Sequence, residues 1–458
     1  MSRLIVVSNR VPLPDKNGNP PPGGLAIALH STLQKHNGLW MGWSGKQSAE
    51  TYIPSLSSQR IGNIEYALTD LTKKDIAEYY NGFANRVLWP TFHCRLDLSE
   101  YARSEMSGYY RVNRLFADLL MPLIEPDDII WVHDYHLIPL AEELRIRGCA
   151  NRIGFFLHIP WPPADILLAM PVYDVILRGL SSYDLVGFHT RYDLDNFAEC
   201  LRREGAGELL GNDLCRAYGR VFRCGAFPIS IDTAEFERVA GDATNDPLVA
   251  RTKASLRGSD LVIGVDRLDY SKGITQRIDA FHRFLQMNTM RMGRTTLLQV
   301  TPTSRSNVPE YAAMQKAVAE LAGRVNGELG TVDWSPVRYI NQSLGRQSLA
   351  GLYRIAKVGL VTPLRDGMNL VAKEYVAAQR PEDPGVLILS RFAGAARELD
   401  SALLVNPYDL DSMASALEVA LSMPRDARVE RWQAMMEKLR TNDIFHWCQS
   451  FLDTLTRD

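Results

Sequence analysis

A turn at residues 365–369 carries charged side chains and a glycine in a place suited to holding a ligand. It follows an apolar run that predicts a strand and precedes a helical pattern at 370–379. Ligands of open α/β sheets bind where strands end and helices begin, because the helix N-terminus offers unpaired N–H groups to phosphate. Gly367 lets the backbone approach a ligand, whereas Asp366 and, one turn into the helix, Glu374 can accept hydrogen bonds from hydroxyl groups. The same pattern also describes an ordinary capped helix.

Two cations follow another predicted strand, at 261–265. Arg267 and Lys272 lie between this strand and the helical pattern after it. Two positive charges in such a place suit a pyrophosphate, since each charge-assisted hydrogen bond contributes roughly 1.5–3 kcal/mol. The alternative is pairing with Asp266 and Asp269 at the surface, which would contribute little.

A second pair of basic side chains suits another phosphate. Arg10 follows the first predicted strand and precedes a loop at 11–22 that is so rich in Pro, Gly and Asn that we expect a mobile lid. A glycine pair ending at Gly24 opens the next helix, where its amides could cradle a phosphate or simply form a tight turn. Arg305 follows a predicted strand at 296–301 and could bind a phosphate together with Arg10.

Other polar and aromatic side chains point to a sugar. Asp134, within the HDYH motif at 133–136, and His158 follow or end predicted strands. Asp134 is expected to accept hydrogen bonds from sugar hydroxyls, with ordinary structural hydrogen bonding as the alternative. A metal site at this motif would need ligands that the sequence does not identify, so no metal is expected. Tyr80 and Trp89 offer flat faces on which a sugar ring could stack, although aromatic side chains more often belong to a core.

Motifs for other chemistries are absent or poor. The segment at 42–46 lacks the spacing of a P-loop, and neither a GxGxxG after the first strand nor a GxSxG is present. The two DxD matches, at 193–195 and 409–411, lie in helical patterns, so metal-bound nucleotide-sugar chemistry is unsupported.

The elements that must position these residues are short apolar strands alternating with helices, as in buried parallel sheets. The strands are predicted at 4–8, 128–133, 152–158, 184–188, 261–265, 296–301, 357–362, 385–390 and 402–406. We therefore predict an α/β protein with two doubly wound sheets facing each other across a cleft. The polar segment 238–252 suggests domains at 1–240 and 241–458. The chain reads as helical from about 409, and the last helix, at about 443–455, is expected to cross back to the first domain.

Composition limits the partners and the compartment. The 458 residues include 51 Lys plus Arg and 53 Asp plus Glu, a net charge of −2, so no nucleic-acid surface is implied. No apolar run approaches the length of a membrane span. The six cysteines show no regular spacing, which favours buried thiols in a reducing cytoplasm over a disulfide framework. The oligomeric state stays open, a homo-oligomer included.

Eight segments together resemble trehalose-6-phosphate synthase, and the resemblance runs nearly from end to end. They lie at 8–10, 23–25, 78–90, 131–137, 155–160, 267–273, 302–305 and 364–379. The resemblance implies a GT-B fold, with two Rossmann-like domains and the active site between them. It also implies transfer of glucose from a nucleotide sugar to glucose 6-phosphate with retained anomeric configuration. The sequence does not reveal the nucleobase of the donor, and UDP-glucose is expected to be among the best donors. No cofactor is expected.

The resemblance implies a role for each candidate residue. Those expected to hold the donor are Gly24, His158, Arg267, Lys272, Asp366, Gly367, Met368, Asn369, Leu370 and Glu374. Those expected to hold the acceptor and its phosphate are Arg10, Tyr80, Trp89, Asp134 and Arg305. Those expected to take part in catalysis are Asp134, His158, Arg267, Lys272 and Asp366. The chain departs from the family pattern at two places. Asp266 stands where glutamate is expected in many relatives, and the lid is unusually rich in proline. Both departures bear on lid dynamics and on the choice of acceptor.

The mechanism depends on whether a carboxylate can attack the sugar. Double displacement needs such a nucleophile, and Asp134 is the nearby candidate, to which the resemblance gives a binding role. A same-face displacement is therefore favoured, in which the leaving diphosphate takes the proton of the incoming hydroxyl. Three alternatives stay open: a transferase that uses another phosphorylated acceptor such as glycerol 3-phosphate, a regulator that binds nucleotide sugar without catalysis, and a pyridoxal-phosphate phosphorylase with Lys373 as its Schiff-base lysine.

Overall fold

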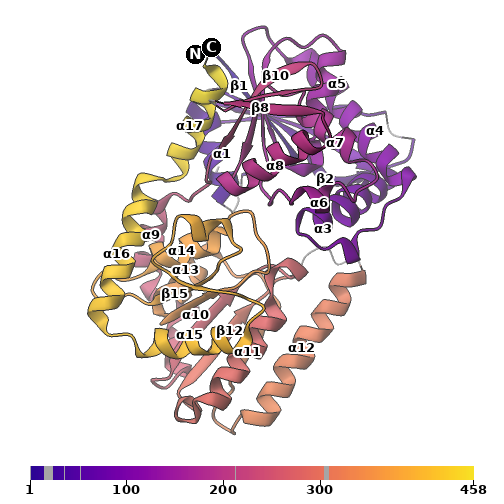
Figure 1. The fold of residues 1–458 in the computed structure, drawn as a ribbon. Coiled ribbons are helices and arrows are strands. Elements are labelled where there is room, and N and C mark those ends of the chain that lie inside the picture. Colours follow the sequence, from indigo (N-terminus) through magenta and orange to yellow (C-terminus); the bar gives the residue numbers. More distant parts are fainter. Residues whose placement is uncertain are drawn as a thin grey trace. The chain divides into compact units, whose positions relative to one another are not determined.

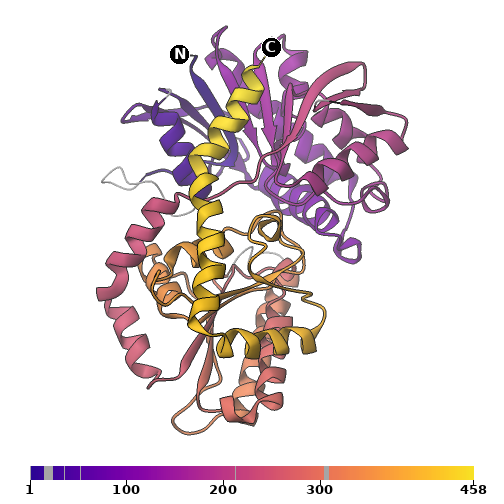
Figure 2. The same cartoon turned by 60° about the vertical axis from the view of Figure 1, so that its left-hand side comes forward.

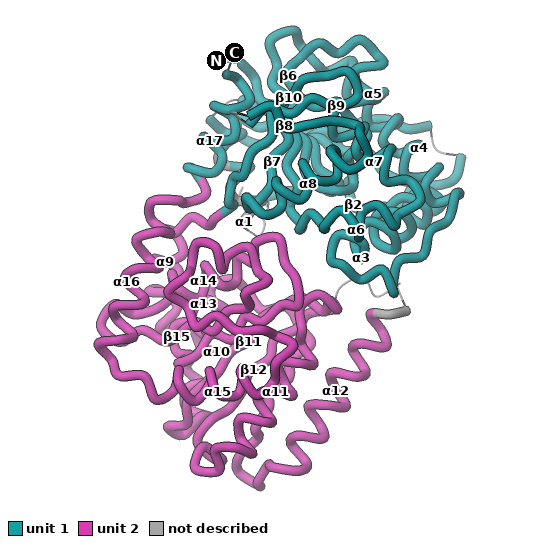
Figure 3. The backbone as a smooth tube through the Cα atoms, in the orientation of Figure 1, with its two compact units in different colours: residues 1–229, 445–458 teal, residues 230–444 magenta. Residues whose placement is uncertain are grey.

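The chain forms two compact units, coloured separately in Figure 3 and labelled by element in Figure 1. The computed structural model describes residues 2–14, 24–35, 37–51, 53–211, 213–303 and 309–457. Unit 1 comprises Met1–Ile229 and Phe445–Asp458, and unit 2 comprises Ser230–Ile444.

The division falls after Ile229, earlier than the boundary near residue 240 suggested by the sequence. The polar segment 238–252 is helical rather than a linker, because it contributes to α9 (Thr233–Asp242) and α10 (Pro247–Ser255) of unit 2. Aspartate side chains at the residue before each helix accept hydrogen bonds from its first turn. Its polar composition thus reflects capping and exposure.

Unit 1 is built on one ten-stranded sheet in the order β3-β4-β2-β1-β5-β6-β7-β10-β9-β8. Its central pairs are parallel, and antiparallel pairs stand at both edges. The strands are β1 Leu4–Arg10, β2 Leu39–Ser48, β3 Ser57–Ile61, β4 Ile64–Thr72, β5 Ile129–His133, β6 Arg152–Phe156, β7 Leu185–Phe188, β8 Gly207–Gly211, β9 Leu214–Ala217 and β10 Arg220–Ala226. The four strands predicted in this half are confirmed as β1, β5, β6 and β7.

Helices cover this sheet, and the last of them comes from the other end of the chain. They are α1 Gly24–Lys35, α2 Lys73–Asp75, a π-helical segment Ile76–Leu88, α3 Trp89–Phe92, α4 Arg103–Leu120, α5 Leu140–Ile146, α6 Ala164–Leu167, α7 Tyr173–Leu180, α8 Arg191–Arg203 and α17 Ile444–Thr456. Figure 2 shows α17, in yellow, lying across the strands. Its Phe451 stacks on Trp131 of β5 with ring centroids 4.6 Å apart. A Cβ atom on Gly154 of β6 would lie 2.7 Å from the Phe451 ring, so the glycine admits this helix.

Unit 2 contains a six-stranded parallel sheet in the order β13-β12-β11-β14-β15-β16. The strands are β11 Asp260–Val265, β12 Thr295–Val300, β13 Val337–Ile340, β14 Val358–Val361, β15 Val386–Ser390 and β16 Leu403–Val405. The remaining helices are α11 Ile274–Met287, α12 Pro309–Leu329, α13 Arg346–Ile355, α14 Leu370–Ala378, α15 Leu410–Ser422 and α16 Arg425–Thr441. All five predicted strands and the helical C-terminal region are confirmed.

Side-chain alternation along β14 separates the two faces of this sheet. Val358 and Leu360 belong to an apolar core with Ile278 of α11. Gly359 between them faces the Tyr375 ring of α14, 2.6 Å from where a Cβ atom would lie. Helices α11 and α14 therefore cover opposite faces, as in a doubly wound fold.

The strand orders of both units contain a topological switch point. In unit 1 the chain runs from β1 to β2 on one side and continues from β5 to β6 on the other, with β1 and β5 adjacent. In unit 2 the same change occurs between the adjacent strands β11 and β14. Ligands of doubly wound sheets bind outside the carboxyl ends of strands at such points.

The cysteines depart in part from the expectation of buried thiols. Cys215 of β9 and Cys224 of β10 form a disulfide, because the antiparallel hairpin brings them together. Cys149, Cys200 and Cys448 are buried free thiols, and Cys94 is half-buried. Among the described residues no helix is long and apolar enough to cross a membrane.

Candidate active site

Lys272 and Asp366 meet at the switch point of unit 2. Lys272 ends a short 3₁₀ turn after β11, and Asp366 follows β14. The Nζ atom of Lys272 lies 2.5 Å from Oδ2 of Asp366, and Nδ2 of Asn369 donates to the same oxygen at 3.0 Å. Only 12% and 13% of the two charged side chains are exposed. The sequence thus placed these residues correctly at two strand ends, and the fold brings them into direct contact.

The turn after Asp366 is shaped by close backbone packing and a capping side chain. A Cβ atom on Gly394 would lie 1.9 Å from the carbonyl oxygen of Gly367, so glycine is required there. Asn369 adopts a left-handed conformation with φ 80°, and its Oδ1 accepts from a backbone N–H of the first turn of α14. The predicted donor-binding backbone forms this turn and the start of α14: Gly367, Met368, Asn369 and Leu370.

Arg267 lies on the loop between β11 and Lys272. Its guanidinium is 3.5 Å from Asp269, which is fully buried and accepts hydrogen bonds from both the N–H and the hydroxyl of Ser271. The alternative was that both cations pair with Asp266 and Asp269 at the surface. It is wrong for Lys272, which pairs with Asp366. Arg267 does pair with Asp269, but that carboxylate is buried rather than at the surface. With 39% of its side chain exposed, Arg267 can still reach a ligand.

Sequence reasoning missed Arg277 as an organiser of this loop. Its guanidinium is fully buried and donates to Asp266 at 2.6 Å, to Thr362 at 3.1 Å and to the carbonyl of Lys272 at 3.4 Å. Arg277 thereby ties the end of β11, the end of β14 and the cation loop together. The sequence does contain a sign of this role, because Arg277 lies on the apolar face of α11 beside Ile278. An arginine buried on such a face must be paired with other polar groups.

Glu374 lies half-buried in α14, one turn after the Asp366 turn. Burial raises the pKa of its carboxyl from 4.5 to about 7, and the charge of Arg346 opposes that shift in part. A carboxyl with such a pKa changes charge near neutral pH, and desolvated carboxylates of this kind often belong to ligand sites.

At the unit 1 switch point, Asp134 and His158 come together. The backbone N–H of His158 donates to Oδ1 of Asp134 at 3.2 Å, and the N–H of Asp134 donates to the carbonyl of Phe156 at 2.8 Å. Asp134 has φ 76° and ψ 164°, a conformation that costs a non-glycine residue about 1–3 kcal/mol. Such strain is typical of functional sites.

His133 and His158, two histidines near Asp134, are held in the neutral form by burial. Nδ1 of His133 lies 3.0 Å from Nε2 of His158. Burial lowers the pKa of His133 to about 3, and burial together with neighbouring histidines lowers the pKa of His158 well below its ordinary value. His158 can therefore take part as a neutral hydrogen-bonding group and carries no charge toward a diphosphate.

Arg10, at the end of β1, begins a row of flat side chains. Its guanidinium lies 5.9 Å from the Trp43 ring, and that ring lies 5.7 Å from the Tyr80 ring. Tyr80 in turn stacks on His136 at 5.7 Å with the planes 14° apart. The predicted acceptor residues Arg10 and Tyr80 are thus joined through Trp43, which sequence reasoning did not single out.

Trp89 differs from this row because it is buried. Only 4% of its surface is exposed, and its ring packs against His93 at 4.2 Å and Tyr135 at 5.7 Å. The flat face that we expected it to offer to a sugar is therefore largely covered by protein.

Several expectations fall on other parts of the chain. Arg305 and most of the expected lid, from residue 15 onward, lie outside the described residues. For Gly24 the structure describes only that α1 begins there.

Lys373 is fully buried and bonded to Glu398 at 2.6 Å, so it is neither a solvated charge nor free for a Schiff base. Within the described part, no group of three His, Cys, Asp or Glu could hold a metal.

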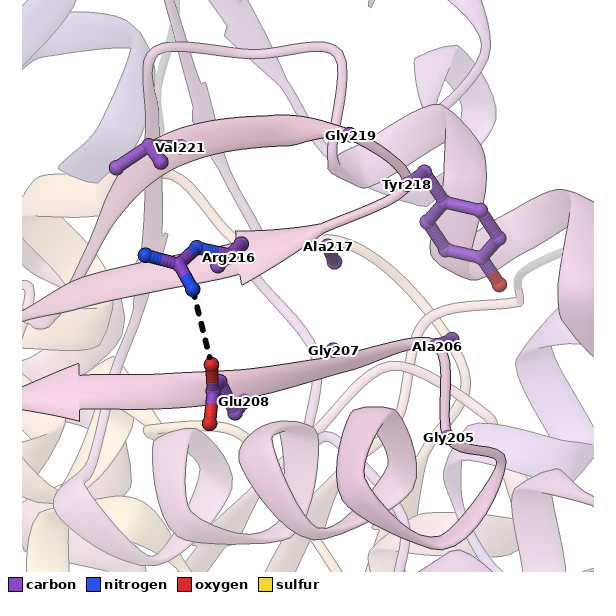
Figure 4. Close-up of a pocket in the computed structure, with 9 residues that line it drawn as sticks. All are labelled: Gly205, Ala206, Gly207, Glu208, Arg216, Ala217, Tyr218, Gly219 and Val221. Atoms are coloured by element: carbon purple, nitrogen blue, oxygen red, sulfur yellow. Dashed lines mark hydrogen bonds and ion pairs between the residues drawn. The ribbon is translucent and has the colours of Figure 1, made fainter.

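A surface hollow of about 460 Å³ lies at the far edge of the unit 1 sheet, beside β8 and β9 (Figure 4). Glycines and Tyr218 line it, and Arg216 contacts Glu208 at 3.3 Å. None of its lining residues was predicted for the site, and neither switch-point strand of unit 1 contributes to it.

The two doubly wound, mainly parallel sheets are those of the GT-B fold, which the resemblance implied and which similar solved structures share. A family model described as glycosyltransferase family 20 matches residues 2–457, and the chain belongs to this family.

Named relatives agree with this assignment. The chain is 63% identical to trehalose-6-phosphate synthase of Sinorhizobium fredii over 457 residues, which cover 100% of this chain and 98% of that relative. A crystal structure of an alpha,alpha-trehalose-phosphate synthase (UDP-forming) from Burkholderia xenovorans in complex with glucose-6-phosphate is 44% identical, with a TM-score of 0.96 and 100% of both chains covered. A trehalose-6-phosphate structure from E. coli bound with UDP-2-fluoro glucose is 46% identical, with a TM-score of 0.94 and 100% of both chains covered.

Proposed function

We propose that this chain is an α,α-trehalose-phosphate synthase that transfers glucose from UDP-glucose to glucose 6-phosphate, forming trehalose 6-phosphate and UDP for trehalose biosynthesis. The observation that carries the proposal is the contact of Lys272 with Asp366 at 2.5 Å. It sets a cation suited to diphosphate beside a carboxylate suited to sugar hydroxyls, at a switch point and before a helix N-terminus. The relatives solved with glucose-6-phosphate and UDP-2-fluoro glucose support the choice of substrates.

Unit 2 holds the donor in this proposal. Arg267 and Lys272 bind the diphosphate together with backbone amides of the turn before α14. Asp366 accepts hydrogen bonds from the glucose hydroxyls, and Glu374 accepts them from the ribose. Support comes from the location of Arg267, Lys272 and Asp366 after the adjacent strands β11 and β14, and of Glu374 in α14, the helix that follows β14.

Unit 1 holds the acceptor sugar. Arg10 binds its phosphate, Tyr80 contacts its ring and Asp134 orients its hydroxyls, and Arg305, which belongs to unit 2, is a further phosphate ligand. His158 and Gly24 contact the donor. The row from Arg10 through Trp43 to Tyr80 and the strained turn at Asp134 support these roles.

Transfer proceeds with retention by same-face displacement. The bond from the anomeric carbon to the diphosphate oxygen breaks, the acceptor hydroxyl oxygen bonds to the anomeric carbon, and the hydroxyl proton passes to the departing diphosphate. Arg267, Lys272 and the helix amides stabilise the charge that develops on the diphosphate, which is the main catalytic contribution. Residues of the chain supply this stabilisation, so the proposal assigns no role to a metal ion.

A panel of donors and acceptors tests the proposal. Purified protein is assayed with UDP-, ADP- and GDP-glucose against glucose 6-phosphate, glycerol 3-phosphate and other sugar phosphates. UDP-glucose with glucose 6-phosphate is expected among the best pairs. A rate with glycerol 3-phosphate about tenfold above that with glucose 6-phosphate, a preference worth about 1.4 kcal/mol, would favour the alternative acceptor and overturn the proposal.

A cytoplasmic location is part of the proposal. Irregular cysteine spacing supports it, whereas a disulfide such as Cys215–Cys224 is more common in oxidising compartments. Cell fractionation with an antibody to the chain tests the location.

A further inference from the structure

Asn85 joins two parts of unit 1 that carry proposed acceptor residues. It lies in the π-helical segment Ile76–Leu88 and is 6% exposed. Its Nδ2 donates to the carbonyl of Tyr80 at 2.7 Å, and its Oδ1 accepts from the hydroxyl of Tyr135 at 2.9 Å. One buried amide therefore bonds both to Tyr80 and to the residue directly after Asp134.

The bond to Tyr80 spans a break in the helix. Gly82, between Tyr80 and Asn85, has φ −74° and ψ −106°, outside helical geometry. The helical backbone is therefore interrupted between these two residues, and the Asn85 amide bridges the interruption. The backbone held in this way carries the Tyr80 ring that stacks on His136.

The bond to Tyr135 fixes the turn that contains Asp134. Tyr135 is buried, its hydroxyl donates to Asn85, and its carbonyl accepts from the hydroxyl of Tyr109 at 2.6 Å. The strained backbone of Asp134 persists only where surrounding contacts hold it, and the two bonds of Tyr135 provide such contacts directly beside it.

We propose that Asn85 is a positioning residue for the acceptor sugar. It holds Tyr80 and Asp134 in a fixed mutual arrangement, so the face that receives the acceptor is preorganised. A small displacement of either residue then weakens acceptor binding far more than donor binding. This inference rests on the proposed function, because it assumes that Tyr80 and Asp134 contact the acceptor.

Three variants test the role. Asn85→Ala removes both hydrogen bonds, and Tyr135→Phe removes one hydroxyl while it keeps the ring. Asn326→Ala is the matched control, because Asn326 of α12 likewise uses both amide atoms, bonding the N–H and carbonyl of Val337 at 2.9 and 2.8 Å in unit 2. For each variant we measure KM for glucose 6-phosphate, kcat, UDP-glucose affinity by calorimetry without acceptor, and Tm.

Asn85→Ala is expected to raise KM for glucose 6-phosphate by about tenfold while UDP-glucose affinity changes by less than about twofold. Tyr135→Phe is expected to raise KM less than Asn85→Ala does. The double variant is expected to raise KM no more than Asn85→Ala alone, because the bond that Tyr135→Phe removes is one of the two that Asn85→Ala already removes. Asn326→Ala is expected to lower Tm without changing KM.

Two results would overturn the inference. One is an Asn85→Ala enzyme with unchanged KM and a loss of Tm like that of Asn326→Ala. The other, which applies if Asn85→Ala does not fold, is an unchanged KM in Tyr135→Phe. Absence of transfer by the unmodified enzyme would instead contradict the proposed function, so the two failures are distinguishable.

Discussion

Lys272 and Asp366 are separated by 94 positions in the sequence, yet Nζ of one lies 2.5 Å from Oδ2 of the other. Each follows a different strand, and the adjacency of β11 and β14 brings them together. Because Asp366 also accepts from Asn369, the pair is fixed within the turn that precedes α14. A ligand that contacts both side chains meets an arrangement that needs little reorganisation.

This contact predicts coupling between the two residues. Lys272→Ala and Asp366→Asn are each expected to weaken UDP-glucose binding, and the double variant is expected to bind more tightly than the sum of the two losses implies. A coupling free energy of at least about 1 kcal/mol is expected for side chains in contact. Calorimetric titration of the wild type and three variants measures it. Strictly additive losses would show that the pair does not act as a unit toward the donor.

Arg267 is predicted to act mainly in the transition state. Its replacement by alanine removes a charge that stabilises the departing diphosphate and is expected to lower kcat by about a hundredfold or more. Arg283→Ala serves as the control, since Arg283 pairs with the exposed Asp411 at 2.7 Å on the surface of the same unit. A kcat for Arg267→Ala as close to wild type as that of the control would leave Arg267 as a partner of Asp269 without a catalytic role.

Glu374 predicts a pH dependence near neutrality. Its pKa is raised to about 7 in the folded chain and lies near 4.5 in the unfolded chain, so the folded state holds the proton longer. Its contribution to the free energy of unfolding therefore falls as pH rises from about 4.5 to about 7. UDP-glucose affinity is expected to increase from pH 6 to 8, as the carboxylate that accepts from the ribose forms.

Glu374→Gln separates this effect from those of other groups. The variant is expected to lose the pH dependence of UDP-glucose affinity over this range and to show a flatter unfolding free energy between pH 4.5 and 7. Denaturant unfolding and calorimetry at several pH values provide both measurements. Identical pH profiles for wild type and variant would assign the dependence to another residue.

Arg305 is predicted to act on the acceptor. Arg305→Ala is expected to raise KM for glucose 6-phosphate strongly, because a guanidinium suits its phosphate. UDP-glucose affinity, measured without acceptor, is expected to change by less than about threefold, a difference under roughly 0.7 kcal/mol. Equal weakening of both ligands would require the division of donor and acceptor roles to be withdrawn.

Short-range patterns predicted much of the fold. Nine short apolar runs were predicted as strands, and all nine are strands in the structure. The prediction succeeds because strands buried on both faces of a parallel sheet consist almost entirely of apolar residues. The strands that were missed are more polar: β2 mixes tryptophans with glycine, serine and lysine, and β10 carries two arginines. The polar segment 238–252 was predicted as a linker but is mostly helical. Exposed helices with polar capping residues have a composition similar to that of linkers, so composition did not distinguish the two.

The residues of the candidate site that follow strands could be predicted from the sequence, whereas contacts between residues far apart in the chain could not. Local turns identified Arg267, Lys272 and Asp366, but their contacts depend on which strands are neighbours, and one sequence does not reveal that. Arg277 and the burial of Trp89 depend on packing between elements. The Cys215–Cys224 disulfide depends on the pairing of β9 with β10, which no spacing rule indicated.

The most direct test of the central claim is the structure of the reaction product. Purified protein is incubated with UDP-glucose and glucose 6-phosphate, and the sugar product is examined by NMR and mass spectrometry while UDP release is followed. We predict stoichiometric UDP release and a phosphorylated disaccharide whose two anomeric centres are both α and joined 1,1. A β configuration at the transferred glucose would contradict same-face displacement. UDP release without any disaccharide, or no turnover, would contradict transfer to glucose 6-phosphate.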